Sequence, residues 1–246
     1  MKLHKQTILI TGGSSGIGLE LAKQLVAKQN NVIICGRSSE RLSQAKAEIG
    51  NVHTFTCDVS QARDRIELMA WISAYHPACN MLVNNAAIVH RTNFCDDPEM
   101  LEKAEREINT NLFAPIALTK MFLAFRDNKP STAIVNITTG LVYAPRAVYP
   151  IYNATKAGLH AFTQVLRHQN AELPLKIIEV MMPVVNTPWH QGHAPKIAIT
   201  PAKAVREMIT GIEKGKQEIK VGAVKLLYIL ARIAPSFAFK KINQIS

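Results

Sequence analysis

Residues 6–18 of the chain read QTILITGGSSGIG. The first half is a short apolar run typical of a buried strand, and the second half is a glycine-rich turn that leads into helix-forming sequence. Gly12, Gly16 and Gly18 have the spacing G-x-x-x-G-x-G. Glycine lets the backbone turn tightly and approach a ligand closely, and the N–H groups of a helix N-terminus favour an anion. Strand, glycine turn and helix in this order predict a dinucleotide site in an α/β fold, although the same glycines would also suit a plain turn.

Strand and helix patterns then alternate along the chain. Apolar runs predict further strands, at 30–36, 52–58, 80–87, 132–139, 175–182 and, as a candidate seventh, 218–222. Helical periodicity predicts helices, at 16–29, 39–50, 61–76, 108–125 and 152–172. Continuous apolar strands between helices are typical of a parallel sheet covered on both faces. The sequence therefore predicts a doubly wound α/β domain of about seven strands over residues 1–246. An irregular segment at 184–200 is expected to form a substrate lid.

The composition restricts the partners. The chain has 246 residues and a formal net charge of +11, which favours anionic partners such as phosphorylated cofactors or anionic lipid. No basic run is interleaved with aromatic residues, so we expect no nucleic acid partner. The four cysteines lack metal-ligand spacing, and His190 and His193 have no third ligand nearby, so we expect no metal site. Buried reduced cysteines and an N-terminal apolar run too short for a signal peptide indicate a cytoplasmic protein.

The end of the second predicted strand indicates which dinucleotide is preferred. The stretch CGRSSER places Gly36 where an acidic residue would bond the ribose 2′-hydroxyl of NAD(H), and Arg37 follows at once. A guanidinium binds phosphate in a forked geometry, and Ser38 would add a hydroxyl donor. We therefore expect NADP(H) rather than NAD(H). Asp58 and Asn85 follow the next two strands, where ligands of open sheets bind, but either would also suit a turn.

Tyr152 and Lys156 stand four residues apart in PIYNATKAGL, which begins at Pro150. This spacing places the two side chains beside each other on one face of a helix. A nearby ammonium lowers the pKa of a phenol and so suits it for acid/base catalysis near neutral pH. Alone, so short a pattern would favour a helix start with a surface lysine, and the glycine turn is what reverses this in favour of the catalytic interpretation.

Taken together, the motifs resemble those of the short-chain dehydrogenase/reductase family. The matching stretches are TGGSSGIG, CDV, NNAA, NTNLF, VNITTG and YNATK, in the family's order from residue 11 to about 188. The resemblance implies one Rossmann-like domain, an NAD(P)(H)-dependent oxidoreductase acting on a small carbonyl or alcohol substrate, and a homodimer or homotetramer. The stretches LRHQ, EIKVG, LARIAP and KKIN are similar to a poorly characterised branch of the family, found with bacterial D-alanyl–teichoic acid functions.

The resemblance also implies roles for single residues. Tyr152 would exchange the proton, and Lys156 would assist it and bond the nicotinamide ribose. Thr139 stands where the family usually has serine, thirteen residues before the tyrosine, and Thr138 competes for this role if the loop register differs. Asn111 would hold a relay water. The predicted cofactor-binding residues are Gly12, Ser14, Ser15, Gly16, Ile17, Gly18, Arg37, Asp58, Val59, Asn85, Ala86, Tyr152, Lys156 and Thr187.

The chain departs from the family pattern beside the site. Ala87 replaces the usual glycine, which implies a shifted backbone, and Val184 replaces a small residue. Candidates to wall the substrate are Tyr143, Arg146, Tyr149, Trp189, His190 and His193. Because of these departures, a second hypothesis stays open, in which the chain binds a dinucleotide as a sensor or scaffold without turnover.

The apolar C-terminal stretch VGAVKLLYILARIAPSFAF is interrupted by Lys225, Arg232 and Pro235, so it does not suit a bilayer-spanning helix. It would suit an amphipathic helix on a membrane or on a protein surface. From the sequence alone, we favour packing on the chain's own domain or on a second copy over peripheral membrane contact.

Overall fold

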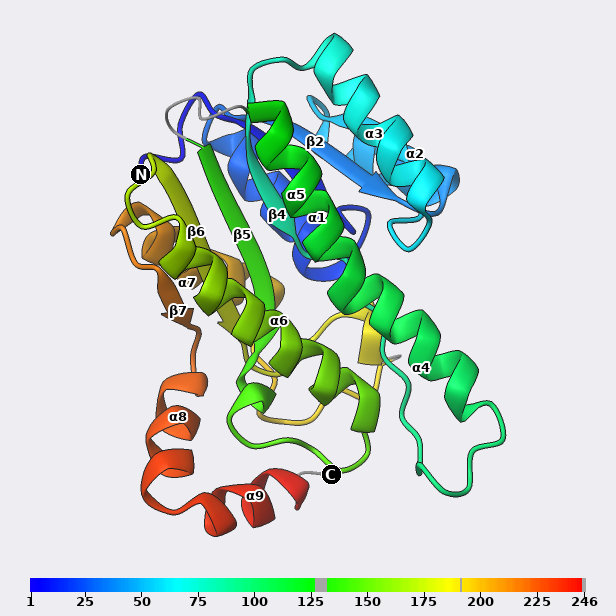
Figure 1. Cartoon of the computed structure of the whole chain (residues 1–246), viewed down its shortest axis with the longest axis vertical. Coiled ribbons are helices and arrows are strands. Elements are labelled where there is room, and N and C mark those ends of the chain that lie inside the picture. Colours follow the sequence, from blue (N-terminus) through cyan, green and yellow to red (C-terminus); the bar gives the residue numbers. More distant parts are fainter. Residues whose placement is uncertain (127–131, 191, 245–246) are drawn as a thin grey trace.

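Seven strands form one parallel sheet in the order β3-β2-β1-β4-β5-β6-β7 (Figure 1). The computed structural model describes residues 1–126, 132–190 and 192–244. The strands are β1 Thr7–Thr11, β2 Asn31–Gly36, β3 His53–Thr56, β4 Cys79–Asn84, β5 Thr132–Thr139, β6 Leu175–Met182 and β7 Glu218–Lys220. Every neighbouring pair is parallel, which confirms the predicted doubly wound sheet, including its seventh strand.

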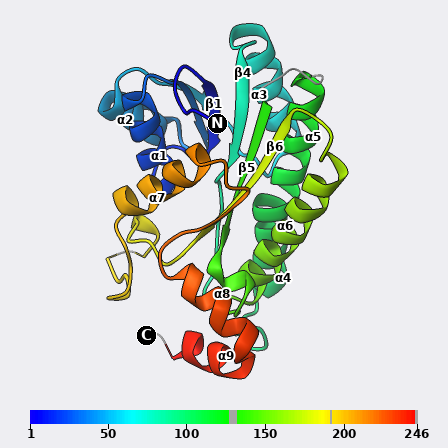
Figure 2. The same cartoon turned by 90° about the vertical axis from the view of Figure 1, so that its left-hand side faces the viewer.

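Helices cover both faces of the sheet (Figure 2). On one face the core is formed with α1, α2 and α7, and on the other with α3 and α5. Helix α6 packs against β5 and β6. The helices are α1 Gly16–Ala27, α2 Ser39–Ile49, α3 Ala62–Tyr75, α4 Met100–Ile108, α5 Ala114–Arg126, α6 Pro150–Gln169, α7 Pro201–Glu213, α8 Val224–Ile233 and α9 Pro235–Asn243.

Two of the five predicted helices differ from the sequence prediction. The single helix expected over 108–125 is a longer run, in which a π-helical turn, Asn109–Phe113, joins α4 to α5. A π-helical turn inserts an extra residue and often marks a functional site. Helix α6 begins at Pro150 instead of Tyr152 and ends at Gln169. Proline suits the first helical position because its fixed φ matches the helix and no N–H is needed there.

The run Met100–Arg126 has the length and apolar composition of a membrane-crossing helix. In α5, however, Ala114, Leu118 and Phe122 are fully buried in the core against the sheet. A helix that covers a sheet of apolar strands needs such a composition, so we assign this run to the helical layer of the domain.

The segment 184–200 leaves the sheet after β6 and returns before α7. Its two ends are paired, because Val185 forms a parallel bridge with Ile199 and the Asn186 amide donates to the Ile199 carbonyl at 2.9 Å. Between these ends lies a short 3₁₀ turn, Pro188–His190, and residue 191 lies outside the described residues. The segment is therefore a loop with a fixed base beside the carboxyl ends of the strands.

The strand order reverses direction at β1, which pairs with β2 on one side and β4 on the other. The connections from these strands leave toward opposite faces, so the carboxyl ends of β1 and β4 border a crevice. The glycine turn after β1 and the NNAA stretch after β4 both open into it.

Phe122 is the largest fully buried side chain and packs under β4 and β5. We expect Phe122→Ala to lower the free energy of unfolding by about 3–5 kcal/mol, because it leaves a cavity that the layer cannot fill. Urea denaturation followed by circular dichroism measures this change. Phe94, which is 58% exposed, is the matched control, and its alanine variant should stay within about 0.5 kcal/mol of wild type. Equal effects of the two variants would contradict the assigned core.

Candidate active site

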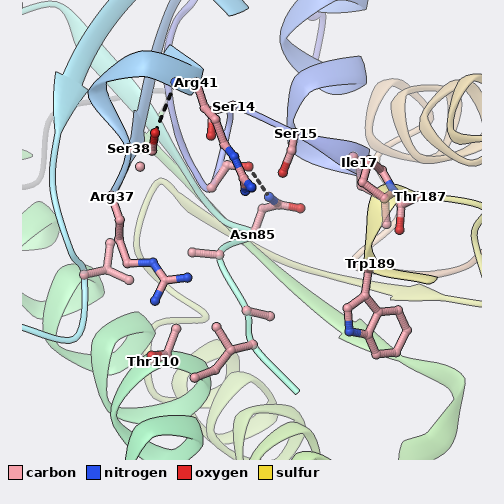
Figure 3. A pocket seen from close by; sticks show the side chains of 18 of the residues that line it. Ser14, Ser15, Ile17, Arg37, Ser38, Arg41, Asn85, Thr110, Thr187 and Trp189 are labelled. Carbon is pink, nitrogen blue, oxygen red and sulfur yellow. Dashed lines mark hydrogen bonds between the residues drawn. The ribbon is translucent and has the colours of Figure 1, made fainter. Parts of the chain in front are cut away.

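A cavity of about 470 Å³ lies at the carboxyl ends of β1, β2 and β4 (Figure 3). Most of the predicted cofactor-binding residues line it. Those residues are Gly12, Ser14, Ser15, Gly16, Ile17, Arg37, Asp58, Val59, Asn85, Ala86, Tyr152 and Thr187. Of the remaining two, Gly18 is buried in α1 and Lys156 is buried behind Tyr152.

The glycine turn has a shape that larger residues would not allow. Gly12 adopts a left-handed φ of +67°, and a Cβ on Gly18 would lie 2.3 Å from the Gly12 carbonyl oxygen. The Asn85 amide donates to that oxygen at 3.2 Å (Figure 3). It also donates to the Thr11 carbonyl oxygen at 2.9 Å. Thus Asn85 locks the turn to the end of β4 as well as lining the cavity.

The start of α1 is open to the cavity. Its N-cap residue, Ser15, makes no side-chain capping hydrogen bond within the described part of the chain, and the first turn contains no acidic residue. The N–H groups of the first turn and the positive end of the helix dipole are then available to an anion. Gly16 also leaves room for Thr187, whose Cβ would be 3.4 Å from a Cβ on Gly16.

Two arginines lie on the β2 side of the cavity. Arg37 follows β2, and Arg41 lies in the first turn of α2, which Ser38 caps by accepting from the Arg41 amide at 3.2 Å (Figure 3). Neither guanidinium is paired with a carboxylate among the residues that the structure describes. Arg41 was missed from the sequence, although its spacing of four from Arg37 across a helix start was the available signal.

Asp58 is less free than expected. One oxygen of its carboxylate accepts from the Ser60 amide at 3.0 Å and from the Ser60 hydroxyl at 2.8 Å. This is an Asx-type turn, the alternative that the sequence left open, and the side chain still lines the cavity.

Tyr152, Lys156 and Thr139 meet at the other end of the cavity. The Lys156 ammonium is 3% exposed, donates to the Ile137 carbonyl oxygen at 2.9 Å and lies 5.9 Å from the centre of the Tyr152 ring. The Thr139 side chain is close enough to the Tyr152 hydroxyl to lower the pKa of the phenol. The predicted juxtaposition of these three groups is therefore present.

The prediction that Lys156 lowers the pKa of Tyr152 is wrong. Burial raises the pKa of Tyr152 well above its ordinary value, and the nearby charge of Glu107 raises it further, whereas the bond with Thr139 opposes the change. Burial also lowers the pKa of Lys156 to about 8, against the charge of Glu179. Desolvation disfavours both charged forms, and it outweighs any attraction between them.

The two adjacent threonines have different partners. Thr138 donates to the Glu179 carboxylate at 2.5 Å, and the same carboxylate accepts from Nδ1 of His160 at 2.8 Å. This hydrogen bond raises the pKa of His160. Glu179 is completely buried on β6. The geometry thus favours Thr139 over Thr138 as the hydroxyl beside Tyr152, and it assigns Thr138 to a buried acid that the sequence did not reveal.

A second buried acid lies one helical turn before Asn111. The Asn111 side chain accepts from the Ile88 amide at 2.8 Å and donates to the Ile88 carbonyl at 2.7 Å. Glu107 accepts from the His90 amide at 2.6 Å and from the His90 ring at 2.8 Å, and burial raises the pKa of Glu107. Spacing of four residues therefore lets one helical face hold the loop 85–90, which lines the cavity. The only sequence signal was polar residues in an apolar helix.

Aromatic side chains border the Tyr152 end of the cavity. The Tyr149 and Trp189 rings lie 5.9 Å apart, and each is 6.3 Å from the Tyr152 ring. His190 packs against Trp189 at 4.7 Å. Tyr143 instead packs against Tyr228 of α8, so we do not assign it to this wall.

Ala87, which replaces the family's usual glycine, has an ordinary backbone conformation. Among the described non-glycine residues only Lys5 and Gln29 have a positive φ, so Ala87 does not occupy a glycine conformation. A metal site is not seen either: in residues 1–126, 132–190 and 192–244, no group of three or more His, Cys, Asp or Glu side chains could hold an ion.

Comparison with known proteins adds a family. The family model described as short chain dehydrogenase matches residues 6–197. An uncharacterised oxidoreductase, DltE of Bacillus subtilis, is 41% identical over 248 residues, covering 99% of this chain and 98% of its own. A fatty acyl-CoA reductase of Acinetobacter baylyi is 30% identical over 236 residues, covering 92% of this chain and 79% of its own.

Solved structures share the fold. A short-chain dehydrogenase from Burkholderia cenocepacia in complex with NADP superposes with a TM-score of 0.85 at 20% identity, covering 98% of this chain and 99% of that one. A short-chain dehydrogenase from Sphingobium yanoikuyae in complex with NADPH gives 0.80 at 22% identity, with 98% and 96% covered. At these identities the likeness establishes the Rossmann-like fold alone.

The burial of Lys156 should make stability depend on pH. The lysine titrates near 10.5 when unfolded and at about 8 when folded, so between these values the unfolded chain binds more protons and stability rises with pH. Each unit of pKa difference corresponds to about 1.4 kcal/mol, so Lys156 should raise the free energy of unfolding by about 3 kcal/mol over this range. The measurement is the free energy of unfolding of wild type and of Lys156→Met at several pH values. The difference between the two proteins should change by this amount from about pH 8 to pH 10.5.

The matched control is Lys216→Met, which replaces an exposed lysine and should give a difference that does not change with pH. A flat difference for Lys156→Met as well would mean that the ammonium is not buried as the structure shows.

Proposed function

Because the chain belongs to the short-chain dehydrogenase family, we propose that it is an NADP(H)-dependent oxidoreductase that transfers a hydride between nicotinamide and a carbonyl or alcohol substrate. In this proposal Tyr152 is the general acid/base. The observation that carries it is the meeting of Tyr152, Lys156 and Thr139 at one end of a cavity whose other end is a glycine turn and a helix N-terminus.

The residues around the cavity fit a dinucleotide. A Cβ on Gly18 would clash with the Gly12 carbonyl, so the turn has the compact form that brings backbone close to a pyrophosphate. The uncapped first turn of α1 offers N–H donors to the same anion. Asn85 holds the turn in this shape, and Thr187 lies against it at the side toward Tyr152.

Two arginines favour NADP(H) over NAD(H). Arg37 and Arg41 both line the cavity on the β2 side, where the cofactor ribose would lie, and Gly36 leaves no acid there to repel a phosphate. A guanidinium binds the oxygens of a phosphate with two parallel hydrogen bonds. The two fold neighbours described as complexes with NADP and NADPH are consistent with this preference.

A bound reduced nicotinamide would supply the hydride, and the side chains would manage the proton. Since its pKa is raised, Tyr152 carries its proton at neutral pH and can donate it to the oxygen of a carbonyl substrate. The Thr139 hydroxyl is placed to donate to the same oxygen, which positions and polarises it. Lys156 has a pKa of about 8, so it retains its charge at pH 7 and stabilises the phenolate that remains after donation.

The surroundings of Tyr152 favour a substrate with an apolar part. Trp189 and Tyr149 offer aromatic surface within 6.3 Å of the Tyr152 ring. Aromatic surface binds apolar groups and excludes water from the reacting atoms. Since one relative is described as a fatty acyl-CoA reductase, medium and long-chain aldehydes belong in the first substrate panel, beside aromatic and short ketones.

We further propose that the enzyme is a homo-oligomer, a dimer or a tetramer. The α4 side presents exposed apolar side chains, with Leu101 81% and Phe113 51% accessible in one chain, and a second copy would cover them. Sedimentation of the purified protein over a range of concentrations tests this assembly.

We expect Tyr152→Phe to reduce kcat for carbonyl reduction by about a thousandfold or more, because the phenyl ring keeps the packing and lacks the proton to donate. NADPH oxidation followed at 340 nm measures the turnover. Binding of NADPH, followed by fluorescence, should change less than about threefold, since the ring itself remains.

This variant separates two hypotheses. Loss of turnover with unchanged NADPH affinity supports the enzyme. A wild type that binds NADPH tightly, turns over no carbonyl in the panel and is unaffected by Tyr152→Phe would instead support a dinucleotide-binding sensor or scaffold. Tyr149→Phe is the matched control, because its ring borders the same wall, and it should keep most of the activity.

We expect Arg37→Ala to raise KM for NADPH by about tenfold or more, since a hydrogen bond between charged groups contributes about 1.5–3 kcal/mol. KM for NADH should change little because NADH has no 2′-phosphate. Steady-state kinetics with both cofactors measures the ratio, and Arg41→Ala should act in the same direction. Arg63→Ala, which removes an exposed arginine of α3, is the control. Equal losses with NADH and NADPH would contradict a role at the 2′-phosphate.

A further inference from the structure

All the charged residues in the last part of the chain are basic. From Ile219 onward there is no aspartate or glutamate, whereas Lys220, Lys225, Arg232, Lys240 and Lys241 all fall there. Four of these cations lie on α8 and α9 or directly at their ends. The segment therefore presents positive charge that no acid of its own neutralises.

Helix α8 is apolar on two opposite faces. On the inner face Val224 and Leu227 pack against Gly140, where a Cβ would lie 3.0 Å from Val224 and 3.4 Å from Leu227. On the outer face Leu226, Ile229 and Ile233, spaced three and four residues apart, are 68%, 51% and 79% exposed. A helix that covers its own domain needs only the inner face, so the outer face requires another explanation.

Helix α9 also exposes apolar and basic side chains. Ala238 is buried, whereas Phe237 is half exposed and precedes the exposed Lys240 and Lys241 by about one helical turn, with the Lys241 ammonium 5.6 Å from its ring centre. We call the exposed apolar side chains and the cations beside them the C-terminal platform. It consists of Lys225, Leu226, Ile229, Arg232, Ile233, Phe237, Lys240 and Lys241. Four of the fifteen large apolar side chains that are exposed in the described chain belong to the platform, which favours a contact site here.

The platform is held firmly on the molecule. Asn243, at the end of α9, donates to the Pro145 carbonyl at 3.1 Å and accepts from the Ala147 amide at 2.6 Å. Both views show α8 and α9 projecting beyond the carboxyl ends of the strands, at one end of the molecule (Figures 1 and 2). The two helices that carry the platform therefore lie at the periphery of the domain.

The charges decide between the two main kinds of occupant. A second copy placed symmetrically on the platform would bring the same unneutralised cations against themselves, which is unfavourable. An anionic bilayer is complementary, because its headgroups attract the lysines and arginine while its acyl boundary accepts the apolar side chains between them. Long basic side chains can extend to the headgroups while the helix that carries them lies deeper in the interface.

We propose that the C-terminal platform docks the protein on the surface of an anionic lipid bilayer. The helices lie in the interface and do not cross the membrane. This inference goes beyond the proposed reductase function and does not depend on it, since binding to lipid is measured without turnover.

The test is co-sedimentation of the full chain with sucrose-loaded vesicles of phosphatidylglycerol and phosphatidylcholine, compared with vesicles of phosphatidylcholine alone. We expect partitioning onto the anionic vesicles that weakens as salt is added. Lys240→Glu/Lys241→Glu should weaken it by about 25-fold or more, since each cation near such a surface contributes about fivefold. Ile229→Ser/Ile233→Ser should weaken it by at least about tenfold, through lost apolar burial.

Matched controls lie elsewhere on the molecule. Lys214→Glu/Lys216→Glu makes the same charge change at exposed residues before β7, and Ile66→Ser makes one substitution of the same kind on α3, where Ile66 is 60% exposed. Both should partition like wild type. All of these positions are exposed, and circular dichroism verifies that each variant is folded.

Three outcomes of the vesicle experiment would overturn the proposal. They are no partitioning of wild type onto anionic vesicles, equal losses in the control variants, and binding that ignores lipid charge and salt. A change in sedimentation of the lipid-free protein caused by Ile229→Ser/Ile233→Ser would assign the platform to a second copy and would also overturn it.

Discussion

The hydrogen bond from the buried Lys156 ammonium to the Ile137 carbonyl is the contact on which the site depends. An ammonium removed from water is stable only where acceptors hold it, so this contact fixes α6 on β5 at one point. Tyr152 lies one helical turn before Lys156, and Thr139 lies two residues beyond Ile137. The same contact thus brings the phenol to the threonine. Successive strand residues point to opposite sides, so a slip of one residue in β5 would exchange Thr139 for Thr138.

Burial dominates the charge states around that contact, and two buried acids modify them. The carboxylate of Glu179 favours the charged form of Lys156, and that of Glu107 disfavours the charged form of Tyr152. A neutral acid beside a cation that stabilises its conjugate base is the arrangement that carbonyl reduction needs. Both acids also have structural partners, since Glu179 accepts from Thr138 and His160, and Glu107 holds the loop that lines the cavity. The residues that tune the site are therefore the ones that hold its walls.

The sequence predicted the sheet and the position of the cavity better than the pKa values of the side chains around it. Apolar strands, glycine spacing and ordered motifs depend on local pattern, and the seven strands and the glycine turn followed from them. The sequence left both Thr138 and Thr139 as candidates for the hydroxyl beside Tyr152. The choice depends on which of the two reaches Glu179 on β6, and the sequence does not show this. Glu179 itself stands in an ordinary apolar run. The pKa of Tyr152 was predicted in the wrong direction because spacing reports a neighbouring charge and not the depth of burial, which is the larger effect here.

The C-terminal platform and helix α6, which carries Tyr152, are joined through one loop. Asn243 of α9 binds the Pro145–Ala147 backbone from one side, and Asn153 of α6 donates to the Arg146 carbonyl at 2.7 Å from the other. Asn153 follows Tyr152 directly, and the loop leads into Tyr149, which packs on Trp189 at the edge of the cavity. Two asparagine side chains thus fix the orientation of the platform relative to the aromatic wall. A surface bound to the platform would therefore lie at a constant angle to the aromatic wall of the cavity.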